Sequence, residues 1–294
     1  MTNIIEARGL VYIYPNGTSA LNNLSLAIKK GQRIALLGAN GAGKSTLLLH
    51  LNGILRPKKG SIVFQGQAVD YRHRSLLALR KNVGIVFQEP DNQLFTANVL
   101  HDITFGPLNL GLTREMALAK SRKAMRETET VSLENKPTHF LSFGQKKRVA
   151  IAGVLAMEPQ VIIFDEPTAG LDPKMALKIM DLLHQLSEQG KTLIISTHDV
   201  DLAYSWADYV YFIKEGSIAG EGTPQELFLR QDLLTACDLY CPWIIEIYRA
   251  MINTGLANQN QQVPANKNEL LKLINESPVR FNTQRIKAIH NCLG

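Results

Sequence analysis

The nine residues GANGAGKST at positions 38–46 constrain the fold of this chain more than any other stretch. They follow the apolar run RIALL and precede LLLHL, so they join a short buried strand to a helix. Their spacing matches G-x-x-x-x-G-K-[ST], a loop whose backbone N–H groups face phosphate oxygens at a helix N-terminus. The sequence therefore predicts a nucleotide-binding α/β protein rather than a glycine-rich turn with an incidental lysine.

Each residue type in this loop suits phosphate chemistry. Gly41 and Gly43 let the backbone turn its N–H groups toward the ligand. Lys44 can reach the β- and γ-phosphates, and Ser45 can offer its hydroxyl to Mg²⁺. Both ATP and GTP fit this pattern. The nucleotide contacts expected from the loop are Gly38, Asn40, Gly41, Gly43, Lys44, Ser45 and Thr46.

A second motif, VIIFDEPTAGLD at 161–172, supplies carboxylates. Four apolar residues followed by two acids predict a buried strand that delivers Asp165 and Glu166 to the carboxyl edge of a sheet, where ligands bind in open α/β folds. Asp165 is then the natural partner of Mg²⁺, and Glu166 is placed to polarise an attacking water as a general base. The alternative, two acids that only cap a strand, is weakened by the phosphate loop.

Two more strands end in polar side chains. His198 follows TLIIST, and Gln88 follows VGIVF, so both should reach the same edge of the sheet. The Gln88 amide can coordinate Mg²⁺ or hold a water. The other six histidines lie in helical or polar contexts, which favour exposed or hydrogen-bonded side chains. They are His50, His73, His101, His139, His184 and His290.

The hydrophobic periodicity predicts an α/β fold with a mixed sheet. Residues 4–14 and 20–28 alternate as antiparallel strands do, and a strand–helix–strand pattern at 161–198 indicates a parallel sheet. Residues 98–157 read as helical, and 209–222 as a terminal hairpin turning at Glu215-Gly216.

The expected organisation is a nucleotide-binding domain at 1–230, a helical subdomain at about 90–157 and a helical extension at 231–294. Within the extension, the Asn/Gln-rich stretch at 256–268 reads as a loop or linker. The extension could supplement an interface or be a poorly constrained tail.

Charge and composition add weaker constraints. A formal net charge of +6 suits polyanionic ligands or an anionic membrane surface, but it is also common on solvated surfaces. The apolar runs are strand-sized, well short of the ~20 residues of a membrane-spanning helix, and the N-terminus does not read as a signal peptide. We therefore expect a cytoplasmic protein whose membrane role, if any, comes through a partner.

The three cysteines, Cys237, Cys241 and Cys292, are expected to be reduced thiols. Cys237 and Cys241 are four residues apart and could share a helix face as half of a metal site, but two ligands fall short of a tetrahedral set.

Taken in order, these motifs resemble those of the ATP-binding-cassette (ABC) ATPases over about residues 1–230. The loop at 38–46 corresponds to Walker A, 161–166 to Walker B, and LSFGQ at 141–145 to the signature, while Gln88 and His198 match the Q-loop and switch residues. The resemblance implies the P-loop NTPase fold, with the signature in the helical subdomain and with ATP and Mg²⁺ as cofactors. It also implies metal contacts through Ser45, Gln88 and Asp165, and catalytic roles for Lys44, Gln88, Glu166 and His198.

The family further implies a head-to-tail homodimer with ATP held between Walker A of one subunit and the signature of the other. Tyr14 fits the aromatic residue that stacks on adenine, with Tyr12 as the competitor. The signature usually carries two adjacent glycines, but here Phe143 precedes Gly144. We expect the ring of Phe143 to point away from phosphate and to contact neighbouring protein, with the opposing subunit as one candidate. The further nucleotide contacts implied are Ser142, Gly144, Gln145 and Asp172.

A narrower resemblance follows Gln88. The run VFQEPDNQLF at 86–95 is similar to ATPases of energy-coupling-factor (ECF) importers, in which Asp91, Asn92 and Gln93 belong to an extra helix facing the membrane subunit. The signature region and CPWIIEIYRAM at 241–251 are most similar to the cobalt-importer ATPases. This implies a transmembrane coupling subunit, a separate metal-capturing membrane subunit and a place on the cytoplasmic face of the membrane. Cobalt is the first substrate candidate, followed by nickel and then a vitamin.

Two other classes compete with transport. A soluble ABC ATPase of chromosomes would separate Walker A from the signature by long coiled coils, whereas about a hundred residues without sustained heptads intervene here. Ribosome-associated members usually carry two cassettes, and this chain has one, so we expect no nucleic-acid partner. A catalytically inactive cassette is disfavoured because Lys44, Asp165, Glu166 and His198 are all present.

Overall fold

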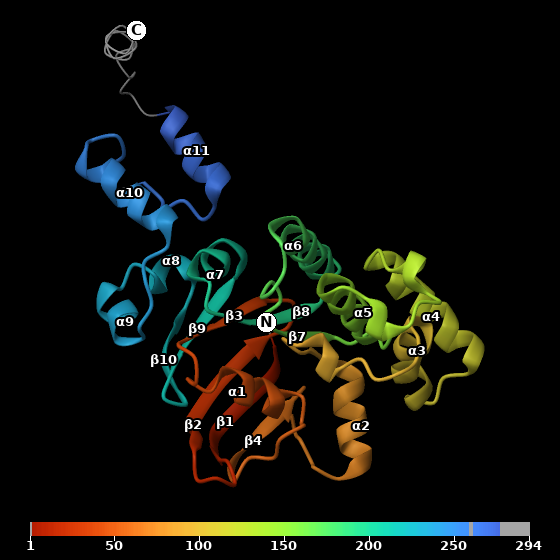
Figure 1. Ribbon diagram of the computed structural model, residues 1–294. Coiled ribbons are helices and arrows are strands. Elements are labelled where there is room, and N and C mark those ends of the chain that lie inside the picture. Colours follow the sequence, from red (N-terminus) through yellow and green to blue (C-terminus); the bar gives the residue numbers. More distant parts are fainter. Residues whose placement is uncertain (1, 259–260, 277–294) are drawn as a thin grey trace, which may run out of the picture.

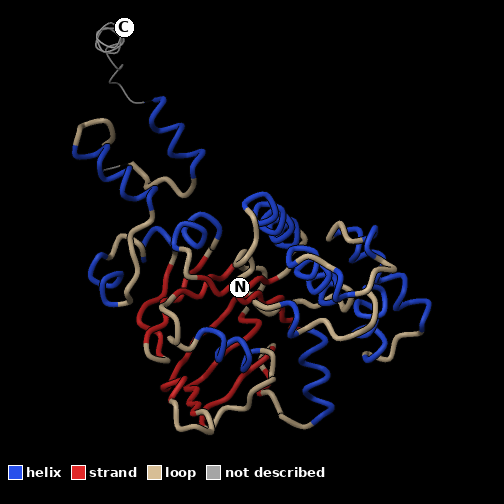
Figure 2. The backbone as a smooth tube through the Cα atoms, in the orientation of Figure 1, coloured by secondary structure: helices blue, strands red, loops and turns tan. Residues whose placement is uncertain are grey.

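The structure, a computed structural model, describes residues 2–258 and 261–276. It contains two sheets, which Figure 2 shows gathered among surrounding helices. One sheet is antiparallel, with the order β2-β1-β4-β5, and the other has six strands in the order β10-β9-β3-β8-β7-β6. The strands are β1 (Asn3–Ile13), β2 (Ser19–Lys29), β3 (Arg33–Leu37), β4 (Lys59–Phe64), β5 (Gln67–Ala68), β6 (Val83–Val86), β7 (Val161–Asp165), β8 (Thr192–Thr197), β9 (Tyr209–Lys214) and β10 (Ser217–Gly222).

The antiparallel sheet forms because its strands alternate in polarity. In the β1–β2 pair Ile5 lies opposite Ile28 and Ala7 opposite Leu26, so one face carries the apolar side chains. These residues pack with α1 (Lys44–Leu51) in one of two apolar clusters. The mixed sheet and the antiparallel β subdomain expected from periodicity are thereby confirmed.

The larger sheet is parallel except for the β9–β10 hairpin. Its strands β3, β7 and β8 are short apolar runs buried along almost their whole length, as parallel strands covered on both faces must be. The hairpin turns at Glu215 (φ 49°) and Gly216 (φ 75°), as the sequence predicted.

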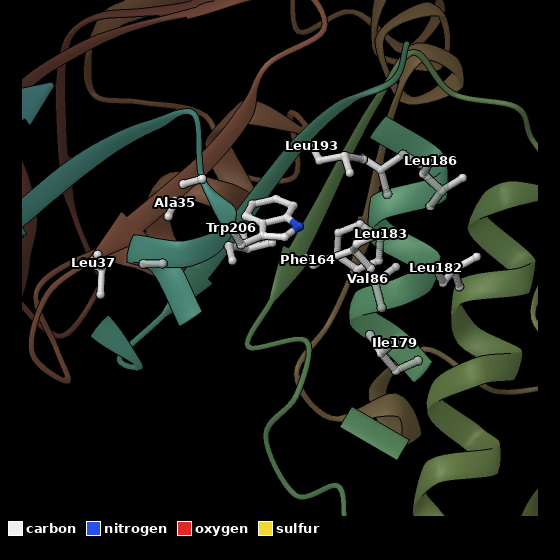
Figure 3. Packing of buried hydrophobic residues seen from close by; sticks show 14 of the residues in the cluster. Ala35, Leu37, Val86, Phe164, Ile179, Leu182, Leu183, Leu186, Leu193 and Trp206 are labelled. Carbon is white, nitrogen blue, oxygen red and sulfur yellow. The ribbon is translucent and has the colours of Figure 1, made fainter. Parts of the chain in front are cut away.

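Helix α6 (Pro173–Glu188) covers one face of this sheet. Its residues Leu182, Leu183 and Leu186 lie in the same apolar cluster as Phe164 and Leu193 of the sheet, and Figure 3 shows these side chains together. Fully burying a leucine contributes about 1.5–3 kcal/mol, so this layer is a main source of stability for the strands that carry the site.

The helical region expected at 98–157 is present, and each of its main helices starts at a capping side chain. The caps are Asn98, Thr113 and Ser142. A further helix, α2 (His73–Asn82), was not predicted from periodicity, and among its residues only Leu79 is buried. The helices are α3 (Val99–Asn109), α4 (Arg114–Glu127) and α5 (Phe143–Leu155), with short 3-10 turns at Pro90–Asn92, Val131–Leu133 and Thr138–Phe140.

Helices α8 and α9 follow the hairpin, and Figure 1 shows α10 and α11 beyond them. Helix α7, which precedes the hairpin, is hydrogen-bonded to the segments beside α10 and α11. The Tyr204 hydroxyl donates to the Pro264 carbonyl at 2.7 Å, and the Trp243 N–H donates to Asp201 Oδ1 at 2.9 Å. The described parts of the extension, residues 231–258 and 261–276, are therefore packed and are not a loose tail. The helices are α7 (Val200–Trp206), α8 (Pro224–Leu227), α9 (Gln231–Ala236), α10 (Trp243–Asn253) and α11 (Lys267–Glu276).

The cysteine pair does not share a helix face. Cys237 caps the C-terminus of α9, and Asp238 (φ 55°) turns the chain so that Cys241 lies in the segment before α10. Both thiols are free and buried, and burial raises the pKa of each. In the described part of the chain no three His, Cys, Asp or Glu side chains gather as a metal set. Cys292 lies outside the described residues.

Within residues 2–258 and 261–276, every helix is too short or too polar to span a bilayer.

His50 is buried in α1, so of the two settings expected for it, exposed or hydrogen-bonded, the second applies. Its Nδ1 donates to the Thr46 carbonyl at 2.7 Å, but within the described residues Nε2 has no hydrogen-bond partner. Burial lowers the pKa of His50 below its ordinary value of 6.5, opposed by the bond to Thr46. The neutral ring is therefore the form that the fold accommodates.

The lowered pKa of His50 predicts that acid reduces the stability of the folded chain through this residue. As the pH falls below about 6.5, the unfolded chain protonates at His50 before the folded chain does, so the free energy of unfolding decreases by up to about 1.4 kcal/mol per pH unit. We expect His50→Gln to lose this part of the slope when urea unfolding is followed between about pH 7.5 and 5.5. His73→Gln, at an exposed site, should keep the wild-type slope. Equal slopes in wild type and His50→Gln would contradict the assignment.

Candidate functional site

The phosphate loop lies between β3 and α1, and close backbone contacts explain its glycines. A Cβ on Gly38 would lie 2.2 Å from the Ile213 carbonyl oxygen, and one on Gly43 2.6 Å from the Ala20 carbonyl oxygen. Gly43 (φ 106°) and Gly41 (φ 81°) are also left-handed, a region that side chains disfavour. The loop conformation therefore requires glycine at these positions.

Lys44 is held inside its own loop. Its Nζ donates to the carbonyls of Gly38 (2.6 Å) and Ala39 (3.1 Å). Burial lowers the pKa of Lys44, and the carboxylates of Glu166 and Asp165 oppose that shift. The side chains of Asn40 and Ser45, by contrast, are exposed.

Tyr14 and Tyr12 differ in what they contact. The Tyr14 hydroxyl is hydrogen-bonded to Thr46 Oγ1 at 2.9 Å, which places Tyr14 at the phosphate loop. The Tyr12 ring makes an edge contact with buried His50, one turn further along α1, with centroids 4.8 Å apart. The geometry favours Tyr14 as the aromatic neighbour of a nucleotide base.

The two acids of the second motif lie at the end of β7, beside β8. Ser196 Oγ donates to Asp165 Oδ1, and the Glu166 N–H donates to the Ser196 carbonyl and hydroxyl, both at 3.2 Å. Glu166 is left-handed (φ 47°), which is unusual for a residue with a side chain. This backbone turn separates the two carboxylates, so that they have different partners.

Glu166 and His198 form a close pair. His198 Nδ1 lies 3.0 Å from Glu166 Oε1, and because a carboxylate only accepts, Nδ1 carries the proton. The Glu166 side chain is 10% exposed and that of His198 is 69% exposed. One end of the pair is thus buried in the sheet edge and the other is open to solvent.

Gln88 follows β6 and its side chain is exposed. Its backbone carbonyl accepts a hydrogen bond from Lys147 Nζ at 2.8 Å, and the Glu166 carbonyl accepts from the same atom at 3.3 Å. Lys147 and Ser196 are site residues that sequence reasoning missed. A helical spacing of four to Ile151 was the available signal that Lys147 faces inward.

The segment after Gln88 behaves partly as expected. Asp91 and Asn92 are exposed in the 3-10 turn, and Asp91 pairs with Lys146 at 2.6 Å. Gln93 instead turns inward: its Oε1 accepts from the Phe87 N–H at 3.2 Å and its Nε2 donates to the Ile85 carbonyl at 3.4 Å. Gln93 therefore supports this loop through two hydrogen bonds to its backbone, and it also lines the groove beside it.

The signature starts helix α5. Exposed Ser142 is the N-cap, and it exchanges hydrogen bonds with Gln145 in a capping box. The Phe143 ring covers Gly170 of the same chain, where an added Cβ would lie 2.9 Å from the ring. A Cβ added to Gly144 would lie 3.3 Å from Met175 and 3.6 Å from Leu171. Phe143 thus has a partner in its own chain, in the loop before α6.

The predicted residues fall into two groups. Lys44, Asp165, Glu166 and His198 meet at the carboxyl edge of the large sheet, and Gln88 adjoins them through Lys147. Ser142, Gly144 and Gln145 lie at the start of α5, while Asp172 caps α6 through a hydrogen bond from the Met175 N–H at 2.9 Å. The first group fits a nucleoside triphosphate, because a glycine-rich backbone loop, a buried ammonium and a carboxylate converge there.

Comparisons with known proteins agree with this geometry. The ABC transporter family profile matches residues 21–169. EcfA, the energy-coupling factor transporter ATP-binding protein of Methanocaldococcus jannaschii, is 50% identical over 244 residues, which are 83% of this chain and 88% of that protein. The chain belongs to the ABC transporter ATP-binding proteins. Within them it belongs to the ECF transporter ATP-binding proteins, and it is an ABC-type ATPase.

Solved cassettes share the fold. The structure of cbiO1 from Clostridium perfringens, part of the ABC transporter complex cbiONQ, has a TM-score of 0.71 and 44% identity, and covers 85% of this chain and 100% of that chain. An ABC cassette solved as a dimer with ADP and Pi has a TM-score of 0.69 at 28% identity, covering 75% of this chain and 98% of that chain. A protein of Methanosarcina mazei named putative ABC transporter ATP-binding protein is 48% identical over 273 residues. The matched stretch is 92% of this chain but only 60% of that longer protein.

The place of Phe143 in this cassette predicts a structural role. Phe143→Gly should keep ATPase activity, because the ring contacts Gly170 and not the carboxyl edge, but it should lower the free energy of unfolding by about 1–3 kcal/mol. Phe140→Gly, at a ring that is 76% exposed, should change stability by less than about 1 kcal/mol. Steady-state ATPase assays and urea unfolding measure both effects. Loss of turnover in folded Phe143→Gly protein would show that the ring takes part in the reaction.

Proposed function

We propose that this chain hydrolyses ATP to energise an ECF-type importer, with Glu166 as the general base for the attacking water. The observation that carries the proposal is the buried Glu166 carboxylate, 3.0 Å from His198 Nδ1, at the edge that also holds Lys44 and Asp165. A base aligned by a histidine beside a phosphate cradle fits phosphoryl transfer to water. His198 is assigned to orient Glu166, and Lys44 to contact the β- and γ-phosphates.

The chain's own residues fit a magnesium nucleotide. Ser45 is exposed at the start of α1, Asp165 accepts from Ser196, and Gln88 follows the adjacent strand β6, so three oxygen-bearing side chains are available. Such hard oxygen ligands suit Mg²⁺, which would neutralise phosphate charge when bound. Tyr14 is assigned to the adenine base. The loop residues Gly38, Asn40, Gly41, Gly43 and Thr46 are assigned to the phosphates.

We propose a head-to-tail homodimer in which the signature completes the partner's site. Ser142 is exposed at the N-terminus of α5, where free N–H groups and the helix dipole favour an anion. In the same chain its side chain bonds only locally with Gln145, so its outward face suits a γ-phosphate from a second copy. Gly144, Gln145 and Asp172 are assigned to the same interface. The similar cassette solved as a dimer with ADP and Pi supports this arrangement.

Coupling to a membrane partner is supported by an apolar groove beside Gln88. The groove encloses about 320 Å³, and its lining includes Leu77, Phe95 and Phe105. Phe95 is 65% exposed and makes an edge contact with Phe105 at 4.7 Å between centroids. Exposed aromatic residues around a groove are typical of an interaction surface, and a helix of the transmembrane coupling subunit is the proposed occupant. The chain would then be peripheral on the cytoplasmic face of the membrane.

The substrate is proposed from similarity alone. Cobalt is the first candidate, supported by the likeness to the cbiO1 structure; nickel is second and a vitamin third. A separate membrane subunit would capture the ion. We also propose the division into a domain at 1–230, with its helical subdomain at about 90–157, and an extension at 231–294.

Glu166→Gln tests the chemistry. The amide keeps the size of the side chain but cannot act as a base, so hydrolysis should fall about 100- to 10,000-fold while ATP binding persists and ATP-bound dimers accumulate. Phosphate release and size-exclusion chromatography with ATP provide the measurements. Glu188→Gln removes a carboxylate that is 67% exposed and should leave turnover unchanged. Unchanged turnover in Glu166→Gln would refute the base assignment.

Uptake tests the transport role. Cells that make this chain with ECF membrane partners should accumulate cobalt, and cells with the Glu166→Gln chain should not. Metal content by mass spectrometry, with nickel measured in parallel, decides the ion. Accumulation of neither metal, together with recovery of the chain with ribosomes or DNA instead of membranes, would overturn the importer proposal.

A further inference from the structure

Lys147 is a buried cation that the proposed hydrolysis does not use. It lies in the second turn of α5, directly after the signature, and its exposed fraction is 0%. Lysine is rarely buried to this extent unless its ammonium is fully partnered. Its surroundings therefore need an explanation.

The ammonium of Lys147 bonds to backbone carbonyls from two separate segments. Nζ donates to the carbonyls of Gln88 at 2.8 Å and Phe87 at 3.2 Å, and to that of Glu166 at 3.3 Å. An ammonium has three hydrogens, so these three acceptors satisfy it. Hydrogen bonds from a charged donor are stronger than neutral ones, which makes this a firm link between the two segments.

The ammonium of Lys147 bonds to backbone carbonyls and does not form an ion pair within the described residues. Among the described residues, the hydrogen bonds of Nζ go to carbonyl oxygens and none goes to a carboxylate. Burial lowers the pKa of Lys147 to about 8, while the more distant carboxylates of Asp165, Glu89 and Glu166 raise it. Burial of this cation costs free energy, and its three hydrogen bonds to backbone carbonyls offset that cost.

The backbone of Glu166 is constrained on both sides as a result. Its N–H donates to Ser196, and its carbonyl accepts from Lys147. Glu166 is left-handed (φ 47°), a conformation that is disfavoured by about 1–2 kcal/mol and persists only when neighbours hold it. The two bonds fix the direction in which the Glu166 side chain leaves the sheet edge.

The flanking cations serve other purposes. Lys146 pairs with exposed Asp91 at 2.6 Å, and Arg148 Nη1 donates to the Glu129 carbonyl at 2.6 Å, near the end of α4. Of these three consecutive residues, Lys147 is the one whose contacts include the Glu166 segment.

We propose that Lys147 is a positioning residue that fixes the backbones of Gln88 and Glu166 to a single atom of the signature helix. This rests on the proposed function for the roles of Gln88 and Glu166. Because both segments are bonded to one ammonium, a displacement of α5 moves the metal-binding loop and the base together. Engagement of the signature by a second subunit is then transmitted to the site of its own chain.

The test compares Lys147→Met, Lys147→Gln and the neighbouring control Lys146→Met in the full chain. Lys147→Met should lower kcat about 100-fold with KM for ATP changed less than about threefold, because the loop and the base are misplaced while Walker A is intact. Lys147→Gln retains N–H donors and should recover about tenfold of that loss. Lys146→Met removes the ion pair with exposed Asp91 and should stay within about twofold of wild type. Hydrogen exchange on nucleotide-free protein should show faster exchange confined to residues 87–93 and 166–170 in Lys147→Met.

Distinct outcomes separate this inference from the proposed function. Equal kcat in Lys147→Met and Lys146→Met, or faster exchange spread evenly over the core, would overturn the positioning role even where Glu166→Gln is inactive. If Lys147→Met does not fold, Lys147→Gln decides: local exchange at the two segments with reduced kcat supports the role, and wild-type kcat and exchange overturn it. An active Glu166→Gln would instead remove the proposed function on which the inference rests.

Discussion

The site depends on the in-register pairing of parallel strands. Leu37 lies opposite Thr197, and Asp165 opposite Ser196, so β3, β7 and β8 end at the same level. The residues that follow these ends are the phosphate loop, Glu166 and His198. Because the strands are buried on both faces, a slip of one residue would place apolar side chains wrongly and is strongly disfavoured. Apolar packing therefore sets the positions of polar groups that do not themselves pack in the core.

The N-termini of three helices also position groups of the site. The N-terminus of α1 opens into the glycine cradle, that of α5 carries the signature, and that of α6 is capped by Asp172. The first turn of α5 contacts the loop before α6 through Phe143 on Gly170, and the first turn of α6 through Gly144 beside Met175. Lys147 extends this contact inward to the sheet edge. The signature helix is thus connected within one chain to the segments before and after the base.

A residue's role can be predicted from sequence where it follows from a local pattern. The phosphate loop needs glycine at fixed positions for steric reasons, and the close approaches at Gly38 and Gly43 are of that kind. Contacts that depend on the path of the backbone or on the docking of elements cannot be predicted in this way. Phe143 meets Gly170 of its own chain, Gln93 folds back on Phe87, and the cysteine pair is divided by a turn at Asp238. Spacing alone does not reveal such contacts.

The fold class, the family and the polar residues at the ends of β3, β6, β7 and β8 can all be identified from local patterns, because apolar runs and loop chemistry encode them. Which of those groups touch depends on the packing of the whole chain. This packing brought His198 to Glu166 and buried Lys147 beneath Gln88 and Glu166, residues 59 and 19 positions away along the chain. A lysine in a charged run reads as a surface residue until packing of α5 against β6 and β7 turns it inward. The four-residue spacing from Lys147 to Ile151 is compatible with an inward face, but the burial of Lys147 and its hydrogen-bond partners are set by that packing.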